Sequence, residues 1–381
     1  MIKSLTINNY KAFGLESNTL QLRPVTIVVG KNNSGKSSLL KLLSILATMS
    51  DGSSLGAIVL KNNSVSLGGR YQDLFHNNDT SSMTIQLEYR NGEMLKFLYL
   101  MNEGELYNNL SLPRRENGGQ SSPVISQANP FKPYIENITS SKGETKNPYL
   151  FTADYIGPLR HSMKRNIQIG SNDDKDLVAD GQNVCEVLLS SFNSDKKLFK
   201  AVADWLEKNL DCSGLTFERN SESSGSYSLS VRHGDAIVNI ADVGQGIGQV
   251  LPLIVSSYMD NHADLTIIEQ PALHIHPAAH QSVAVRIVGS AMKMGRTFLV
   301  ETHSYNFILA IRDMVADSSN PLTPKDVIIY SVEQDDNESW LKPITINEYG
   351  ELSDWPEGVF AESYELLKSI KSHSTKSIDS K

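Results

Sequence analysis

The chain has 381 residues, of which 40% are hydrophobic and 20% are charged, an ordinary globular composition that allows a sizeable core. A net charge of -8 argues against a protein that coats nucleic acid nonspecifically, although it does not exclude a local basic groove. The chain has only two cysteines, which predicts a cytoplasmic protein with neither disulfides nor a cysteine-based zinc site. The N-terminus is unlike a secretory signal, and no apolar run is long enough to span a membrane, so no membrane span is expected.

The first part of the chain is predicted to contain mainly strands, with one helix after the third of them. Its strands are expected at residues 4–10, 19–22, 25–29, 83–89 and 94–101. The helix is expected to begin at Ser38 and to end near residue 48. Residues 112–148 are rich in Pro, Asn, Ser and Gly, which predicts a long surface loop before a strand at 149–156.

The rest of the chain is predicted to alternate helices and strands. Helices are expected at 184–210, 248–259, 278–294 and 305–316, and strands at 215–219, 227–232, 236–240, 265–268, 297–301 and 327–332. This alternation predicts an α/β fold with a largely parallel, mixed core sheet and N-terminal antiparallel strands. Residues 70–230 are expected to form an inserted helical and β subdomain, and residues 369–381 a disordered tail.

The segment after the strand at 25–29 matches the phosphate-loop pattern GxxxxGK[ST] at every position. Its residues are Gly30, Lys31, Asn32, Asn33, Ser34, Gly35, Lys36 and Ser37, and Ser38 follows. A strand, a glycine-containing turn and a helix N-terminus direct backbone N–H groups and a positive dipole end at one place. Lys36 is expected to contact the β- and γ-phosphates and Ser37 to ligate Mg²⁺. The pattern therefore predicts a P-loop protein that binds a nucleoside triphosphate.

Two later strands end in residues that suit the same site. The apolar strand at 265–268 leads to Glu269, whose carboxylate is expected to hold Mg²⁺ beside the P-loop. Gln270 follows at the position where a second acid would polarise the attacking water. The strand at 297–301 leads to His303, which is expected to donate a hydrogen bond to charge that develops on the γ-phosphate. Glu269 and Glu301 are alternative candidates for the hydrolytic base.

Together these motifs resemble the ABC ATPase superfamily, in particular its RecF/SMC-like and overcoming-lysogenization-defect-like heads, including bacterial AAA family ATPases of defence loci. Gly244, Gln245 and Gly246 resemble a degenerate signature loop, in which Gly244 replaces the usual serine. The order of P-loop, signature loop, acid-ended strand and His-ended strand is that of the superfamily. The resemblance covers nearly the whole chain, least at 70–230, and involves the segments 5–13, 155–160, 242–252, 268–277, 300–304 and 354–360.

The resemblance implies an ATP-binding head that forms a head-to-tail homodimer with two ATP molecules between the protomers. Each site would combine the P-loop, Glu269 and His303 of one protomer with residues 244–249 of the other. Hydrolysis is expected to be slow, because Gln270 replaces the usual catalytic glutamate and cannot accept a proton. Neither long coiled-coil arms nor a nuclease domain is expected, so a nuclease or toxin effector would be a separate protein encoded nearby.

The resemblance thus predicts the sensor or regulatory ATPase of a bacterial anti-phage defence module. Two other functions stay open: a RecF-like DNA-repair ATPase that binds DNA, and a noncatalytic ATP-dependent scaffold. Nucleic-acid binding and assembly beyond a dimer are also left open. Arg160 and Arg165 are candidates either for nucleotide or nucleic-acid contacts or for a solvated surface. His274, His276 and His280 form a weak metal pattern, because no cysteine or acid supports them.

Overall fold

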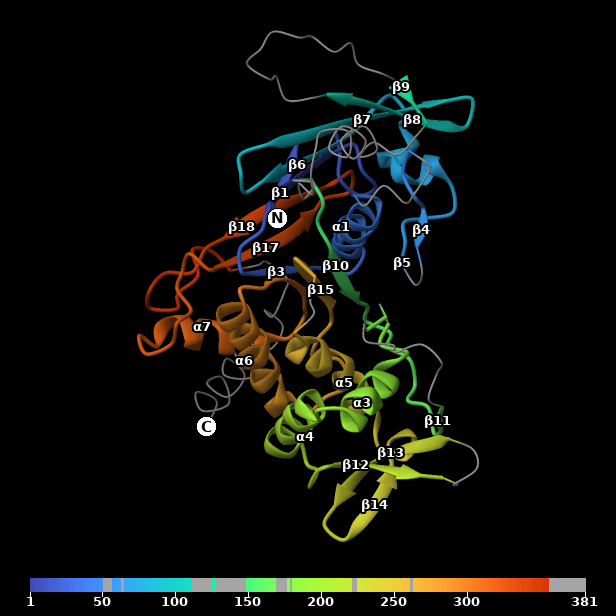
Figure 1. Ribbon diagram of the computed structural model, residues 1–381. Coiled ribbons are helices and arrows are strands. Elements are labelled where there is room, and N and C mark those ends of the chain that lie inside the picture. Colours follow the sequence, from blue (N-terminus) through green and yellow to red (C-terminus); the bar gives the residue numbers. More distant parts are fainter. Residues whose placement is uncertain are drawn as a thin grey trace, which may run out of the picture.

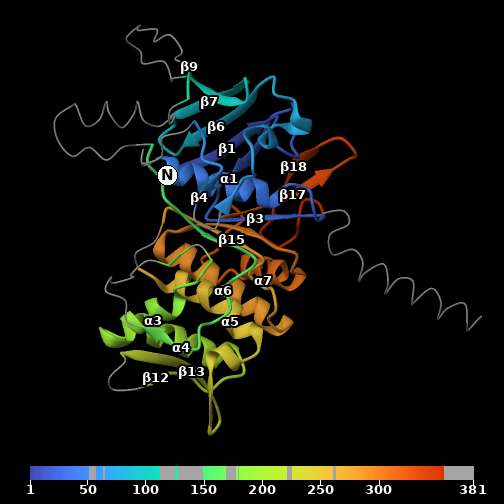
Figure 2. The same cartoon turned by 90° about the vertical axis from the view of Figure 1, so that its right-hand side faces the viewer.

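The chain forms stacked layers in the computed structural model (Figure 1, Figure 2). An antiparallel sheet at one end is followed by helix α1, a central sheet, a layer of helices and a small peripheral sheet. The structure describes residues 1–50, 57–62, 65–111, 125–127, 149–168, 177–178, 180–220, 225–260 and 263–355. The loop predicted at 112–148 lies outside the described residues except for 125–127, and the tail predicted at 369–381 lies wholly outside them.

The central sheet has six strands, of which five are parallel. Its order is β10 (Ala153–Ile156), β15 (Leu265–Glu269), β16 (Thr297–Glu301), β3 (Val25–Gly30), β17 (Val327–Gln334) and β18 (Ser339–Ile344), and β18 is the antiparallel one. Every residue of β3, β15 and β16 is buried, because layers cover both faces of the sheet. The parallel, mixed sheet predicted from the alternating pattern is confirmed.

The antiparallel sheet and α1 cover one face of the central sheet. The strand order is β2 (Asn18–Gln21), β1 (Ile2–Asn8), β6 (Met83–Tyr89), β7 (Met94–Asn102), β8 (Glu105–Ser111) and β9 (Ile125–Ser126). Helix α1 (Lys36–Ser50) shares one apolar core with the buried side of this sheet and with residues of β15 and β16. Short elements nearby are β4 (Lys61–Asn62), β5 (Val65–Ser66) and the 3-10 helices Tyr71–Leu74 and His76–Asn78.

Helices cover the other face, and the peripheral sheet lies beyond them (Figure 1). The helices are α3 (Val184–Asn193), α4 (Lys197–Asn209), α5 (Gln245–Tyr258), α6 (Pro277–Met294) and α7 (Tyr305–Ala316). The peripheral strands are β11 (Ile167–Gln168), β12 (Leu215–Arg219), β13 (Ser226–His233) and β14 (Ala236–Asn239), and the 3-10 helix Ile240–Asp242 precedes α5. None of the helices that the structure describes is both long and apolar enough to span a membrane.

Two sequence expectations differ from the structure in this region. The single helix expected at 184–210 is two helices, because Lys196 adopts a left-handed conformation (φ 60°) between α3 and α4. Residues 70–230, expected to form one inserted subdomain, lie in three places: β6–β9 extend the sheet of β1, β10 lies at the edge of the central sheet, and β11–β13 with α3 and α4 lie at the periphery.

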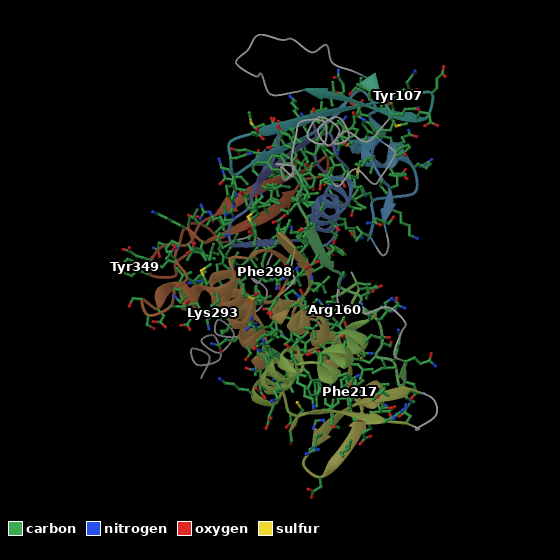
Figure 3. The ribbon with its side chains drawn as sticks, viewed as in Figure 1. Tyr107, Arg160, Phe217, Lys293, Phe298 and Tyr349 are labelled. Atoms are coloured by element: carbon green, nitrogen blue, oxygen red, sulfur yellow. The ribbon has the colours of Figure 1, made fainter. Side chains whose placement is uncertain are left out.

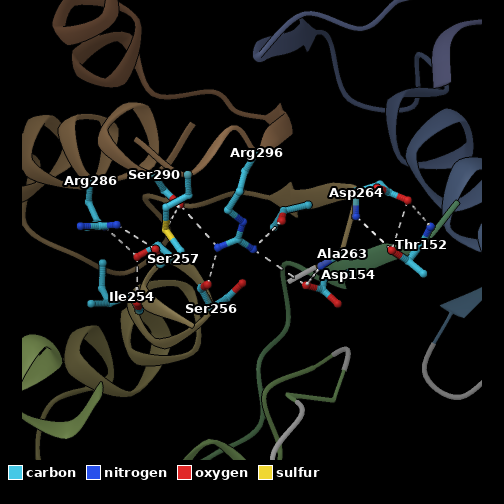
Figure 4. A network of polar contacts seen from close by, with 12 residues as sticks. Thr152, Asp154, Ile254, Ser256, Ser257, Ala263, Asp264, Arg286, Ser290 and Arg296 are labelled. Atoms are coloured by element: carbon cyan, nitrogen blue, oxygen red, sulfur yellow. Dashed lines mark hydrogen bonds and ion pairs between the residues drawn. The ribbon is translucent and has the colours of Figure 1, made fainter. Parts of the chain in front are cut away.

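A buried arginine links the helical layer to the central sheet (Figure 4). Arg296, between α6 and β16, donates from Nη1 to the Ser256 carbonyl of α5 (2.6 Å) and from Nη2 to Thr266 Oγ1 of β15 (2.9 Å). Its Nη2 also lies 3.9 Å from Asp154 Oδ2 of β10. Burial lowers the pKa of Arg296 to about 10, so the guanidinium stays charged at neutral pH. This one cation therefore contacts α5, β15 and β10.

Replacing Arg296 with Met is expected to lower the free energy of unfolding by about 3 kcal/mol, because buried acceptors lose a charged donor. The matched control is Arg286→Met. Arg286 donates to Oγ and the carbonyl of Ser257 from a partly exposed position, so its loss is expected to cost less than that of the fully buried Arg296. Urea denaturation of both variants measures the difference, and equal losses would contradict the role assigned to Arg296.

Candidate nucleotide-binding site

The P-loop connects β3 to α1, as predicted, and two of its residues must be glycine. Gly30 has φ 148°, and a Cβ there would lie 2.6 Å from the carbonyl oxygen of Val332 in β17. Gly35 has φ 93°, and a Cβ there would lie 2.9 Å from the Cβ of Ala12. Both positions combine a left-handed conformation with a close neighbour, so a side chain at either would distort the turn.

Lys36 is buried at the start of α1 and points back into the loop. Its Nζ donates to the carbonyl oxygens of Gly30 (3.0 Å) and Lys31 (2.7 Å) and lies 3.8 Å from Glu301 Oε1. Burial lowers the pKa of Lys36, and the carboxylates of Glu301 and Glu269 oppose that shift. The ammonium group therefore lies within the turn of the P-loop.

The structure brings together the two residues predicted to hold Mg²⁺. Ser37 Oγ donates to Glu269 Oε2 at 2.7 Å, and Glu269 is buried at the end of β15. The second carboxylate oxygen, Oε1, accepts a hydrogen bond of 2.6 Å from the hydroxyl of Tyr155 in β10. A hydroxyl and a carboxylate are the hard oxygen ligands that Mg²⁺ prefers, so the donor set fits this ion.

Gln270 and His303 both approach the carboxylate of Glu301. Gln270 Nε2 donates to Glu301 Oε1 at 3.0 Å, and His303 Nε2 lies 3.4 Å from the same oxygen. Burial raises the pKa of Glu301 to about 7, with Lys36 acting in the opposite direction. Burial and the charge of Lys36 lower the pKa of His303, which favours the neutral imidazole at pH 7. The residues expected to serve hydrolysis therefore form one contiguous polar group.

Arg160 fixes the backbone that follows β15. This buried side chain donates to the carbonyl oxygens of Glu269 (2.8 Å), Gln270 (3.1 Å) and Gln249 (2.9 Å), the last of which belongs to α5. Figure 3 shows it between the central sheet and the helical layer. Gln270, one of the residues bonded in this way, has a left-handed conformation (φ 51°). The solvated surface considered for Arg160 is wrong, since its side chain is buried, and a nucleotide contact stays a prediction. Arg165 is exposed and pairs with Asp242.

The candidate signature residues lie at a second location. Gly244, Gln245 and Gly246 form the start of α5, and a Cβ at Gly246 would lie 3.0 Å from the carbonyl oxygen of His274. They line a pocket of about 420 Å³ together with Leu210, Asp211, Val243, Ile247, His274, Ile275 and His276. In the described structure this lining includes neither the P-loop nor Glu269, Gln270 and His303.

His280 has a structural role that the sequence does not indicate. Its Nδ1 lies 2.7 Å from Ser304 Oγ, and its Nε2 lies 3.2 Å from the carbonyl oxygen of Ile275. Ser304 also caps α7, where its Oγ accepts from the backbone N–H of Phe307. Both ring nitrogens of His280 therefore connect α6 to its neighbours. Among the described residues, no group of three His, Cys, Asp or Glu side chains could hold a metal ion.

Three family models match the chain. The model described as AAA ATPase domain matches residues 1–155. The model described as AAA domain, putative AbiEii toxin, Type IV TA system matches residues 105–310. A family described as protein of unknown function (DUF3696) matches residues 322–370. No curated protein matches the chain by sequence.

Solved structures of SMC heads have a similar fold. One is the SMC head bound to the C-winged helix domain of ScpA, with 14% identity and a TM-score of 0.55 over 90% of this chain and 97% of that chain. Another, derived from Pyrococcus furiosus, is an Smc head domain with an extended coiled coil bound to the C-terminal domain of ScpA. Its identity is 10% and its TM-score 0.54, over 97% of this chain and 99% of that chain.

The family models define the class of protein as an ATPase with an AAA domain, and its fold is similar to that of SMC heads. The chain belongs to the family described as AAA domain, putative AbiEii toxin, Type IV TA system, whose model matches more than half of it. The resemblance and the α/β P-loop fold predicted from the sequence are thereby confirmed. The longest helix in the described part is α6, with 18 residues, so this part has no coiled-coil arm.

Proposed function

We propose that the protein binds ATP with Mg²⁺ and that its ATP-bound state is a head-to-tail homodimer. The pocket at Gly244–Gly246, whose lining does not include the P-loop residues, supports this proposal most directly. The P-loop, Glu269 and His303 would hold the nucleotide, while Gly244–Gly246 of the second protomer would close over the γ-phosphate. A symmetric pair of chains completes two such sites at once, since each protomer gives one half to each.

The proposed binding of Mg²⁺ by Glu269 can be tested by changing Tyr155, whose hydroxyl donates a hydrogen bond to one oxygen of the Glu269 carboxylate. Outer-shell partners of this kind commonly alter metal affinity by 10–100-fold. Tyr155→Phe is therefore expected to raise the Mg²⁺ concentration needed for half-maximal ATP binding by about tenfold, with ATP binding in EDTA unchanged. Tyr330→Phe is the matched control, because its hydroxyl accepts from the Gln21 backbone and not from or to a candidate Mg²⁺ ligand. Equal shifts in both variants would reject the Mg²⁺ assignment.

Hydrolysis is proposed to be slow. Gln270 occupies the position after the metal-binding acid, and its amide can hydrogen-bond to water without accepting a proton. General-base assistance is worth about 10²–10⁴-fold, and a base held away from position 270 is expected to supply only part of it, so the ATP-bound dimer is long-lived. A long-lived state suits a regulatory protein more than a motor. A wild-type turnover of many per second would contradict this part of the proposal.

The proposed biological role is that of a sensor or regulatory subunit in a bacterial anti-phage defence module with a separate effector. The defence part of this role is supported by the family description, which names a putative toxin of a Type IV toxin–antitoxin system. The SMC heads with similar folds were solved in complex with another protein, ScpA, which fits a head that acts through a partner.

Purification with the product of the neighbouring gene tests this role, with mass and ATP turnover measured with and without DNA. A stable complex in which ATP alters a nuclease or toxin activity is the expected result. Turnover stimulated by DNA without any such partner would instead favour a RecF-like repair ATPase. ATP binding and dimerisation with no turnover at all would favour a noncatalytic scaffold.

A further inference from the structure

The carboxylate missing at position 270 has a counterpart on the adjacent strand. β15 and β16 are parallel neighbours, and Glu269 and Glu301 are opposite each other in their register. Gln270, which follows Glu269, donates from Nε2 to Glu301 Oε1 on the neighbouring strand at 3.0 Å. The amide of Gln270 is thus in contact with the carboxylate of Glu301, next to the position where other ATPases of this kind have the catalytic glutamate.

Glu301 is buried, with 3% of its surface exposed, yet only one of its oxygens is satisfied. Oε1 faces Gln270 Nε2, His303 Nε2 and Lys36 Nζ at 3.0, 3.4 and 3.8 Å. Oε2 has no hydrogen-bond partner among the described residues. A buried acceptor without a partner is costly and so needs an explanation. The groups around the other oxygen, Oε1, include Lys36 of the P-loop, so this carboxylate lies beside the candidate phosphate site and a ligand of that site is the partner we infer for Oε2.

Glu269 is not free to take this role. One of its oxygens accepts from Ser37 and the other from Tyr155, at 2.7 and 2.6 Å. Its position also matches that of the metal-binding acid. Of the two candidates for the base, Glu301 alone therefore has an unengaged carboxylate oxygen.

We propose that Glu301 is the catalytic carboxylate, with Oε2 orienting the attacking water and accepting its proton. The inference rests on the proposed ATP hydrolysis and names the residue that performs its proton transfer. The water oxygen forms a bond to the γ-phosphorus while the bond from phosphorus to the bridging oxygen breaks, and its electron pair leaves with ADP. The proton on Glu301 returns to the released phosphate. Gln270 and His303 hold the carboxylate in place through Oε1.

The first test compares Glu301→Gln with the wild type in three measurements: single-turnover hydrolysis, ATP affinity and the lifetime of the ATP-bound dimer. Hydrolysis is expected to fall by about 10²-fold or more, because the amide cannot take a proton. ATP affinity is expected to stay unchanged, and the dimer is expected to persist longer. Glu88→Gln is the matched control, since Glu88 pairs with Lys3 in the antiparallel sheet and should leave all three values unchanged.

The second test exchanges the pair in one chain, as Gln270→Glu with Glu301→Gln. One carboxylate and one amide remain in contact, so hydrolysis is expected to recover at least tenfold over Glu301→Gln alone. Hydrolysis by Glu301→Gln at the wild-type rate, with normal ATP binding, would overturn the inference and leave the proposed ATPase intact. An exchanged variant no faster than Glu301→Gln would also count against it. Wild-type protein that binds ATP and dimerises without turnover would contradict the proposed hydrolysis itself.

Discussion

Lys36→Ala is expected to weaken ATP binding by about 10–100-fold, the equivalent of one or two charge-assisted hydrogen bonds. The ammonium group is buried in the P-loop and bonds to the carbonyls of Gly30 and Lys31, so it is already held beside the phosphate position. Removing it leaves the β- and γ-phosphates without their lysine contact. Isothermal calorimetry on the monomer measures the loss directly.

The matched control for this variant is Lys41→Ala, which removes the same charge from the same helix further from the loop. Its ATP affinity is expected to stay within about twofold of the wild type, because a partly exposed charge is well screened. Unchanged affinity in Lys36→Ala would reject the assignment of the P-loop as the nucleotide site.

Gly246→Arg is expected to abolish the ATP-dependent dimer while ATP binding by the monomer persists. Gly246 lies at the N-terminal end of α5, where a Cβ would already be 3.0 Å from the His274 carbonyl. A long side chain there would fill the pocket that is proposed to receive the partner's γ-phosphate, and only glycine leaves room for such an approach. Mass measurement with and without ATP, together with calorimetry, separates the two effects.

A second glycine in a helix offers a control for this substitution. Gly289 lies in α6, and a Cβ there would meet no atom within 4 Å. Gly289→Arg is therefore expected to dimerise with ATP as the wild type does. If Gly246→Arg also dimerises normally, residues 244–246 do not form the interface half-site.

The sequence was sufficient for features that depend on neighbouring residues. The P-loop was recognisable because a strand, a fixed glycine pattern and a helix follow one another directly along the chain, from Val25 to Ser50. The ends of β15 and β16 were equally clear, since continuous apolar runs are typical of buried parallel strands. Glu269 and His303 could therefore be placed at the ends of two strands from the sequence pattern alone.

Contacts between distant segments could not be predicted in this way. Tyr155 reaches Glu269 because β10 pairs with β15, although more than a hundred residues separate them in the chain. Arg160 bonds to three carbonyl groups that no side-chain pattern encodes. The bond between Gln270 and Glu301 depends on the register of two strands and on the left-handed backbone at Gln270. Sequence patterns specify the residues of such a site more readily than their partners.

The most direct measurement of the proposed composite site is ATP turnover by a mixture of Lys36→Ala and Gly246→Arg proteins. Each variant alone should be inactive, because both of its sites lack one half. A mixed dimer has one intact site, formed by the unchanged P-loop of one protomer and Gly246 of the other, so turnover well above that of either variant alone should return. A mixture that stays as inactive as either variant alone would contradict a site shared between two protomers.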